Sequence, residues 1–450
     1  QVSLVRRMAQ RRGWGEYFSY SRDIYILLLF TLGKGFQISI GSVSINLYAH
    51  SLGFDAGFIG LLTAAPAIGA LVASVPIGLL ADRIGRKPLL LVSGFLNPLS
   101  LAAVGLSTDK TFLLAASLAN GFLSSAYWVT NLPMLTEGTS DDQRVGVMAL
   151  NNFLLLGIGS LGALLGGLVP ELVGRIAHMP ADATVPLRYG VVASAVVTFL
   201  PAVPLLWLHE PDRLKAEQRE ERRGAVPPAV PGNIEPAAAP MVATQVAETT
   251  KVAEVAEPVG RWGAVKLFTQ LLVPDMLFST GEGAVVGLLQ LFFFLKFGTD
   301  VGEVGVIFAV AGLIGGMTAL TAPRFVRRFG QLSIATTMQY LSAPIMLIIG
   351  FSPLLPLAIA AEFARRILRG LFDPTYATFA MERVSSRHRA TLSGFYSVTW
   401  SIGFSIGPAI AGFLWKNISF SSAFVVGAAM LAVSATLLRA FFGKGAPILR

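Results

Sequence analysis

A few ionisable residues lie inside long apolar runs of this 450-residue chain, where a charge is costly and usually functional. Lys34 and Glu282 lie in two of these runs, and a third run holds Glu362, Arg365, Arg366, Arg369 and Asp373. Helical spacings of four residues put Glu362 beside Arg366 and Arg369 beside Asp373. An arginine can bind a carboxylate or phosphate through two hydrogen bonds, and a desolvated acid can carry a proton. The pattern predicts a substrate-binding or proton-coupling site made of Lys34, Glu282, Glu362, Arg366, Arg369 and Asp373.

Two questions about this predicted site stay open in the sequence. The charges between 362 and 373 can equally form a self-neutralised structural cluster, because intramembrane charges commonly pair with one another. The candidate proton carriers are the acids Glu282, Glu362 and Asp373. Which of them binds a proton depends on burial and on nearby basic groups, which act in opposite directions on an acid.

The elements that hold these residues are apolar runs of membrane-spanning length. Hydrophobic residues make up 54% of the chain and charged residues 14%, whereas soluble proteins carry about 25% charged residues. This composition argues against a soluble enzyme, a disordered chain and a nucleic-acid-binding domain. Because a spanning helix needs about 20 apolar residues, we predict an all-α protein of the lipid bilayer. Its twelve transmembrane helices are expected at 24–48, 57–80, 89–106, 111–135, 145–170, 187–208, 271–296, 303–322, 332–351, 353–380, 391–415 and 420–442.

Most of the 35 lysines and arginines fall on the side of this bundle that holds both chain ends and the central linker. Because basic residues favour the cytoplasmic side, we expect an inner (plasma) membrane protein with cytoplasmic termini. The predicted parts are a cytoplasmic segment 1–23, a six-helix half 24–208, a flexible linker 209–262, a second six-helix half 263–442 and a tail 443–450. Residues 261–272 predict a short amphipathic surface helix that ends at Pro274.

The two halves repeat each other weakly. Gly33-Lys34-Gly35 in the first run matches Gly281-Glu282-Gly283 in the seventh. Parallel repeats of six spans around a central site are one plan of secondary transporters. We therefore hypothesise that Lys34 and Glu282 face each other across that site, as a pair that substrate or a proton can break.

The connection between the second and third runs carries the sharpest motif, Gly78-Leu79-Leu80-Ala81-Asp82-Arg83-Ile84-Gly85-Arg86-Lys87-Pro88. It resembles the signature loop of the major facilitator superfamily, and the span number, repeat and linker agree with that family over almost the whole chain. The resemblance implies two halves that alternate access to a central site, in a transporter that we expect to act as a monomer. It also implies a conformational lock formed by Gly78, Asp82, Arg83, Gly85, Arg86 and Lys87, with a simple topological anchor as the alternative.

Two glycine-rich spans resemble a motif of the family's drug:proton antiporters. Span 11 holds Gly403, Gly407, Pro408 and Gly412, and span 5 holds Gly162, Gly166 and Gly167. Ala163 stands where that motif has a proline in span 5, so close packing through small residues is an equal alternative. The arginine that these exporters usually carry in span 4 is replaced by Ser117, which does not support coupling through that position.

Polar and aromatic residues scattered through the spans indicate a mixed central pocket suited to an amphipathic organic molecule. They are Gln37, Asn46, Tyr127, Trp128, Asn131, Asn151, Asn152, Gln290, Tyr376, Tyr396 and Trp400. The sequence has no cysteine, no phosphate-binding loop and only four scattered histidines, so we expect no cofactor and no metal, with a proton gradient as the driving force. No catalytic constellation can be assigned, and we expect a protein that is not an enzyme.

These features predict a secondary active transporter of a small molecule, with proton-linked export of an organic or drug-like compound as the first interpretation. A proton-coupled transporter of organic anions or lipid-like amphiphiles is the alternative, favoured by four basic against three acidic residues inside the spans. A non-transporting receptor or scaffold is the alternative from another class. Large soluble domains would favour it, and the sequence predicts none.

Overall fold

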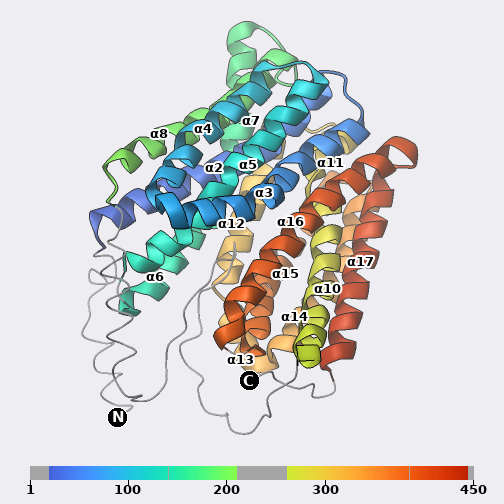
Figure 1. The fold of residues 1–450 in the computed structure, drawn as a ribbon. Coiled ribbons are helices and arrows are strands. Elements are labelled where there is room, and N and C mark those ends of the chain that lie inside the picture. The colour runs from blue at the N-terminus through green and yellow to red at the C-terminus, as the bar shows by residue number, and fades with distance from the viewer. Residues whose placement is uncertain (1–19, 140, 210–260, 385, 444–450) are drawn as a thin grey trace, which may run out of the picture.

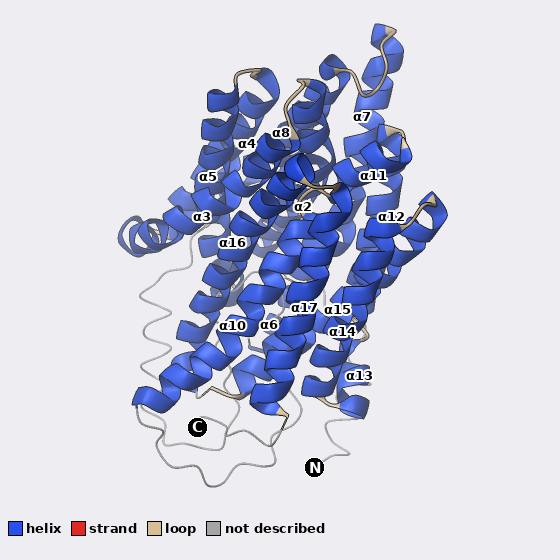
Figure 2. Ribbon diagram, turned by 90° about the vertical axis from the view of Figure 1, so that its right-hand side faces the viewer, coloured by secondary structure: helices blue, strands red, loops and turns tan. Residues whose placement is uncertain are grey.

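The computed structural model describes residues 20–139, 141–209, 261–384 and 386–443, and these ranges form a bundle of long helices without a strand (Figures 1 and 2). The N-terminal half contains α2 (Arg22–Ser51), α3 (Ala56–Ile84), α4 (Arg86–Leu106), α5 (Lys110–Glu137), α6 (Asp141–Asn152), α7 (Gly162–Ala177) and α8 (Thr184–Ala202). The C-terminal half contains α10 (Arg261–Val286), α11 (Leu289–Phe297), α12 (Val301–Ala319), α13 (Ala322–Phe329), α14 (Gln331–Phe351), α15 (Leu355–Glu382), α16 (Ser386–Asn417) and α17 (Phe420–Phe442).

Eleven segments of the described ranges are long and apolar enough to cross a membrane. The remaining predicted span, 353–380, forms the 28-residue helix α15, whose central charges lower its hydropathy. The predicted all-helical membrane fold is confirmed. The charges of α15 must therefore be neutralised inside the protein.

Several helices begin at the capping residues that the sequence provides. The carboxylates of Asp55 and Asp109 accept hydrogen bonds from the backbone N–H groups of Phe58 and Phe112, at 2.9 and 2.8 Å. Asp300 opens α12 in a capping box with Glu303. These side chains satisfy N–H groups that the first helical turn leaves without partners.

Two predicted elements differ from the structure. The expected surface helix 261–272 is wrong, because α10 continues through Pro274 to Val286 and the chain breaks only before α11. A proline is tolerated inside a buried membrane helix when neighbouring helices supply compensating contacts, and the Ser434 hydroxyl of α17 donates to the Pro274 carbonyl at 2.6 Å. The fifth span is not one helix either: a π-helical turn, Phe153–Gly157, and a 3-10 turn, Ile158–Leu161, separate α6 from α7.

The two halves meet mainly along two helix pairs, α3 with α16 and α7 with α12. We call the end of the bundle that holds the α2–α3 and α16–α17 connections the far end, and the end where α10 begins the linker end. At the far end, Lys416 pairs with Asp55 at 3.2 Å, and the Asn46 amide donates to the Gly287 carbonyl at 2.8 Å. Toward the linker end, α6 diverges from α13 and α15 (Figure 1). The halves are thus closed against each other at the far end.

Candidate functional site

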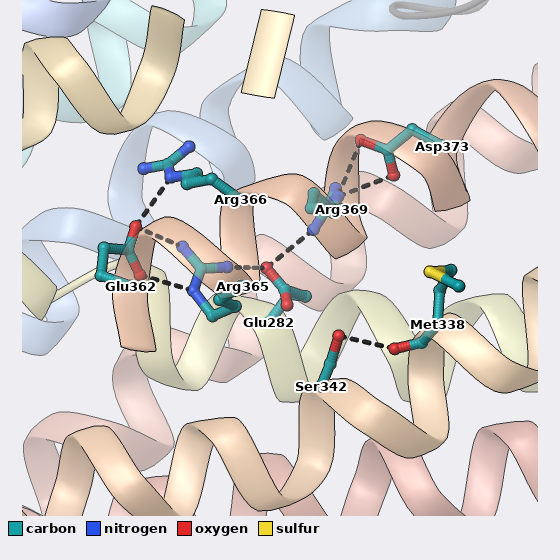
Figure 3. Close-up of polar contacts among 8 residues, drawn as sticks. All are labelled: Glu282, Met338, Ser342, Glu362, Arg365, Arg366, Arg369 and Asp373. Carbon is teal, nitrogen blue, oxygen red and sulfur yellow. Dashed lines mark hydrogen bonds and ion pairs between the residues drawn. The ribbon is translucent and has the colours of Figure 1, made fainter. Parts of the chain in front are cut away.

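A network of buried ion pairs joins α10 to α15 (Figure 3). Arg365 is its centre and is only 1% exposed. Its Nε and Nη2 atoms donate to the two oxygens of Glu362 at 2.7 and 2.9 Å, and its Nη1 donates to Oε2 of Glu282 at 2.9 Å. The bidentate pairing with Glu362 is the geometry that a guanidinium forms best with a carboxylate.

The network extends further along α15 toward Asp373. Arg366 donates from Nε to Glu362 at 2.7 Å, and Arg369 donates to both oxygens of Asp373 at 2.6 and 2.7 Å. These are the two pairs that the four-residue spacing predicts. Arg369 also reaches Glu282 on α10 at 2.8 Å. Three arginines and three carboxylates therefore neutralise one another across two helices.

Arg366 is the least enclosed member of this network. Its side chain is 27% exposed, whereas Glu362 is fully buried. Among the described residues only Glu362 binds it, through Nε, and its two terminal nitrogens point away from the network in Figure 3. These nitrogens offer the parallel donors with which arginine binds a carboxylate or phosphate.

Lys34 lies in a separate polar cluster of the N-terminal half and is 1% exposed. Its ammonium donates to Oε1 of Gln37 at 2.9 Å and to Oδ1 of Asn97 at 2.7 Å. The hypothesis of a Lys34–Glu282 pair is therefore wrong for this structure, because Lys34 binds two amide oxygens of its own half and Glu282 binds two arginines of its own half. Asn97 was not among the predicted residues, and its only signal is a polar side chain inside the apolar run 89–106.

A second buried network links α2, α5 and α6. The Thr31 hydroxyl donates to Asn151 at 2.8 Å, the Tyr127 hydroxyl donates to Thr31 at 3.1 Å, and the Asn131 amide donates to Asn151 at 3.2 Å. Three of the predicted pocket residues, Tyr127, Asn131 and Asn151, join this network. These bonds fix the three helices against one another.

The other predicted pocket residues lie at several levels of the bundle. Asn46 contacts the C-terminal half at the far end, and Tyr376 donates to the Leu271 carbonyl at 2.7 Å. The remaining ones are the buried Gln290, the half-buried Trp128, Asn152 and Tyr396, and Trp400, which stacks on Phe404 and is 37% exposed. A pocket lined by these residues remains a prediction.

Asp275 is a buried acid that the sequence reasoning missed. It lies on α10 next to Pro274, and its Oδ2 accepts a hydrogen bond from the Thr399 hydroxyl at 2.5 Å. With Asp275 counted, four acidic residues balance the four basic residues inside the spans. The predicted excess of basic residues is therefore wrong, and it gives no support to an anionic substrate.

A family model described as Major Facilitator Superfamily matches residues 26–279 and again residues 275–448. The chain belongs to the Major Facilitator Superfamily. This membership makes it an integral membrane transporter and not an enzyme. Which branch of the superfamily it represents is a separate question.

Individual relatives of this major facilitator protein are distant or match only briefly. "Solute carrier family 22 member 2" of Oryctolagus cuniculus is 35% identical over 92 residues, which are 20% of this chain and 17% of that protein. A bacterial homolog of the human lysosomal transporter Spinster, solved in an inward-facing and occupied conformation, superposes with a TM-score of 0.70 at 14% identity, covering 92% of this chain and 95% of that one. A D-xylose-proton symporter superposes with a TM-score of 0.69 at 13% identity, covering 94% and 97%. These two likenesses show the fold alone.

The signature loop of this major facilitator protein lies at the linker end. Gly85 adopts φ +94°, Arg86 forms an ion pair with Glu137 of α5, and the Lys87 ammonium donates to the Leu206 carbonyl at 3.1 Å. Arg83 is exposed, and a side chain at Gly78 would meet open space. The side chain of Asp82 lies outside the described part of the structure. The visible contacts of the loop stay within the N-terminal half, so a lock between the halves remains a prediction.

The glycines of both motifs lie where backbones approach closely. A methyl group added at Gly403 or Gly407 would meet backbone atoms of α10 within 2.6 Å, and one at Gly162 would meet α2 at 2.6 Å. At the boundary between the halves, Gly167 lies against Val301 and Gly302 of α12. Gly166 similarly faces Ile40, while Gly412 and Pro408 of α16 face Gly60 of α3.

Proposed function

We propose that this major facilitator protein transports a small organic anion by alternating access, in a cycle coupled to protons. The observation that carries this proposal is Arg366, whose terminal nitrogens point out of an otherwise paired network. Its single carboxylate partner, Glu362, is shared with Arg365. A substrate carboxylate or phosphate would complete the hydrogen bonding of this guanidinium.

Lys34 supports an anionic substrate from the opposite half. It is a buried ammonium with two amide oxygens as hydrogen-bond partners, and among the described residues no carboxylate pairs with it. A buried cation without a counter-ion is unfavourable, and an anion bound between the halves would relieve that cost. Arg366 and Lys34 would then hold the substrate from two sides, as the rocking of two repeats around a midplane site requires.

Export of an amphipathic, drug-like molecule is a second candidate. It is favoured by the exposed stack of Trp400 on Phe404, which offers an apolar aromatic surface on α16. We further propose cytoplasmic termini in an inner (plasma) membrane, on the basis of the basic residues at the linker end. With that orientation, the closed far end faces outward.

Exchange transport in proteoliposomes separates these candidates. Vesicles loaded with unlabelled compound are supplied with the same compound in labelled form, using benzoate, succinate, phenyl phosphate, tetraethylammonium and glucose as probes. The proposal expects exchange of at least one anionic probe and its net accumulation when a proton gradient is imposed. Exchange of tetraethylammonium alone, or of glucose alone, would refute the anion proposal.

A further inference from the structure

One buried carboxylate of the C-terminal half stands outside the arginine network. Asp275 is 9% exposed and lies seven residues before Glu282, about two helical turns nearer the linker end on the same side of α10. Its hydrogen-bond partner is the hydroxyl of Thr399 on α16. In the described ranges, no lysine or arginine forms an ion pair with it, in contrast to Glu282, Glu362 and Asp373.

The Thr399 hydroxyl can serve both protonation states of Asp275. Its oxygen lies 2.5 Å from Oδ2 of Asp275 and 3.0 Å from the carbonyl oxygen of Tyr396. A hydroxyl has one proton to donate and lone pairs with which to accept. When Asp275 is ionised, Thr399 donates to it. When Asp275 is protonated, its O–H donates to Thr399, and Thr399 turns its own proton to the Tyr396 carbonyl.

The other buried acids lack this freedom. Glu282, Glu362 and Asp373 accept hydrogen bonds from guanidinium groups, which have no lone pair with which to accept a proton in return. Protonating any of them would break an ion pair and leave a buried donor without a partner. The acids of the arginine network are therefore held by partners that can only donate.

We propose that Asp275 is the proton-binding residue of the transport cycle and that Thr399 is the partner that stabilises both of its states. The proton is taken from water and returned to it, and no other bond changes. The coupling role rests on the proposed function, whereas proton binding at Asp275 stands on this geometry alone. Thr399 belongs to α16, and α16 packs against α3 where the two halves are closed at the far end. Protonation of Asp275 therefore changes a hydrogen bond to a helix that takes part in this closure.

The surroundings of Asp275 do not supply a fixed counter-charge. The charged and titratable groups near it are Arg369, Asp373, Tyr376 and Tyr396. Arg369 and Asp373 act on it with opposite signs and bind each other. From α17, the neighbouring contact is the uncharged Ser434 hydroxyl, which bonds to the Pro274 carbonyl. The charge of Asp275 is therefore free to change with its own proton.

Infrared difference spectroscopy of the purified full-length protein in lipid vesicles tests proton binding without any substrate. Acidification adds a carbonyl band for every carboxylate that becomes protonated, and the chain has 26 acidic residues. The signal of Asp275 is therefore the wild-type difference spectrum minus that of Asp275→Asn, in which we expect the band of one protonated carboxylic acid. Thr399→Val should move the pH midpoint of this band, whereas the matched control Thr280→Val should not. Thr280 is a buried threonine of α10 whose hydroxyl bonds, among the described residues, only to the Met276 carbonyl. A spectrum of Asp275→Asn identical to that of wild type, or equal midpoints in the two threonine variants, would overturn the proposal. If Asp275→Asn does not fold, the threonine pair decides the question.

Transport tests the coupling role. With an anionic probe that the wild-type protein exchanges, we expect Asp275→Asn to lose accumulation driven by a proton gradient while exchange continues. Accumulation by Asp275→Asn equal to wild type, or accumulation driven by a sodium gradient at constant pH, would contradict this role. If the wild-type protein exchanges no anionic probe, the proposed function is refuted. The infrared experiment still decides separately whether Asp275 binds a proton.

Discussion

Adding one methyl group at Gly412 should disturb the closed far end of the transporter. An ideal Cβ at this position would lie 2.4 Å from the Ala56 carbonyl oxygen and 2.9 Å from Cα of Gly60. Ordinary contacts begin at 3.4 Å, so α3 and α16 must separate locally by about 1 Å. Such overpacking costs about 1–3 kcal/mol, which corresponds to a shift of about 5- to 150-fold away from this conformation.

Distances between two spin labels at the far end measure that shift. The sequence has no cysteine, so Asp182→Cys and Ile418→Cys provide two unique and exposed attachment points, one in each half. We expect Gly412→Ala to add a population with a longer distance. The control is Gly394→Ala in the same helix, where a methyl group meets nothing within 4 Å. Identical distance distributions in the two variants would refute the role assigned to this contact.

Two other predictions concern charges. Replacing Arg365 by Met leaves Glu282 and Glu362 buried without their shared partner. We therefore expect the free energy of unfolding to fall by about 3–5 kcal/mol, measured as a lower thermal midpoint by circular dichroism. An unchanged midpoint would contradict this prediction. At the far end, the backbone N–H of Phe58 and then Lys416 lower the pKa of Asp55. The ion pair therefore stabilises closure at neutral pH and is lost as the pH falls through the lowered pKa of Asp55. The spin-label distance should lengthen on acidification in wild type and not in Asp55→Asn.

The sequence predicts correctly those features that depend on residues close together in the chain. Helix periodicity and apolar length predict the spans, and a spacing of four residues predicts both Glu362–Arg366 and Arg369–Asp373. These contacts lie within one helix, so the chain itself brings the partners together.

The sequence was a poor guide wherever the partner comes from another helix. The internal repeat places Lys34 and Glu282 at equivalent positions of the two halves, but equivalent positions need not be in contact. Glu282 binds Arg365, which lies 83 residues later in the chain on another helix. Asp275 lies inside the predicted span 271–296, but nothing in the local sequence indicates its partner Thr399 on α16. A proline inside a packed bundle is supported by neighbours that local sequence does not reveal.

The most direct test of the central claim, that Arg366 binds an anionic substrate, is the initial rate of anion exchange in proteoliposomes. We expect Arg366→Ala to abolish exchange of a probe that the wild-type protein carries, while the control Arg439→Ala, at an exposed position of α17, exchanges at the wild-type rate. Equal thermal midpoints of the two variants would show that the loss is not one of folding. A folded Arg366→Ala protein that exchanges the anion at the wild-type rate would contradict the account.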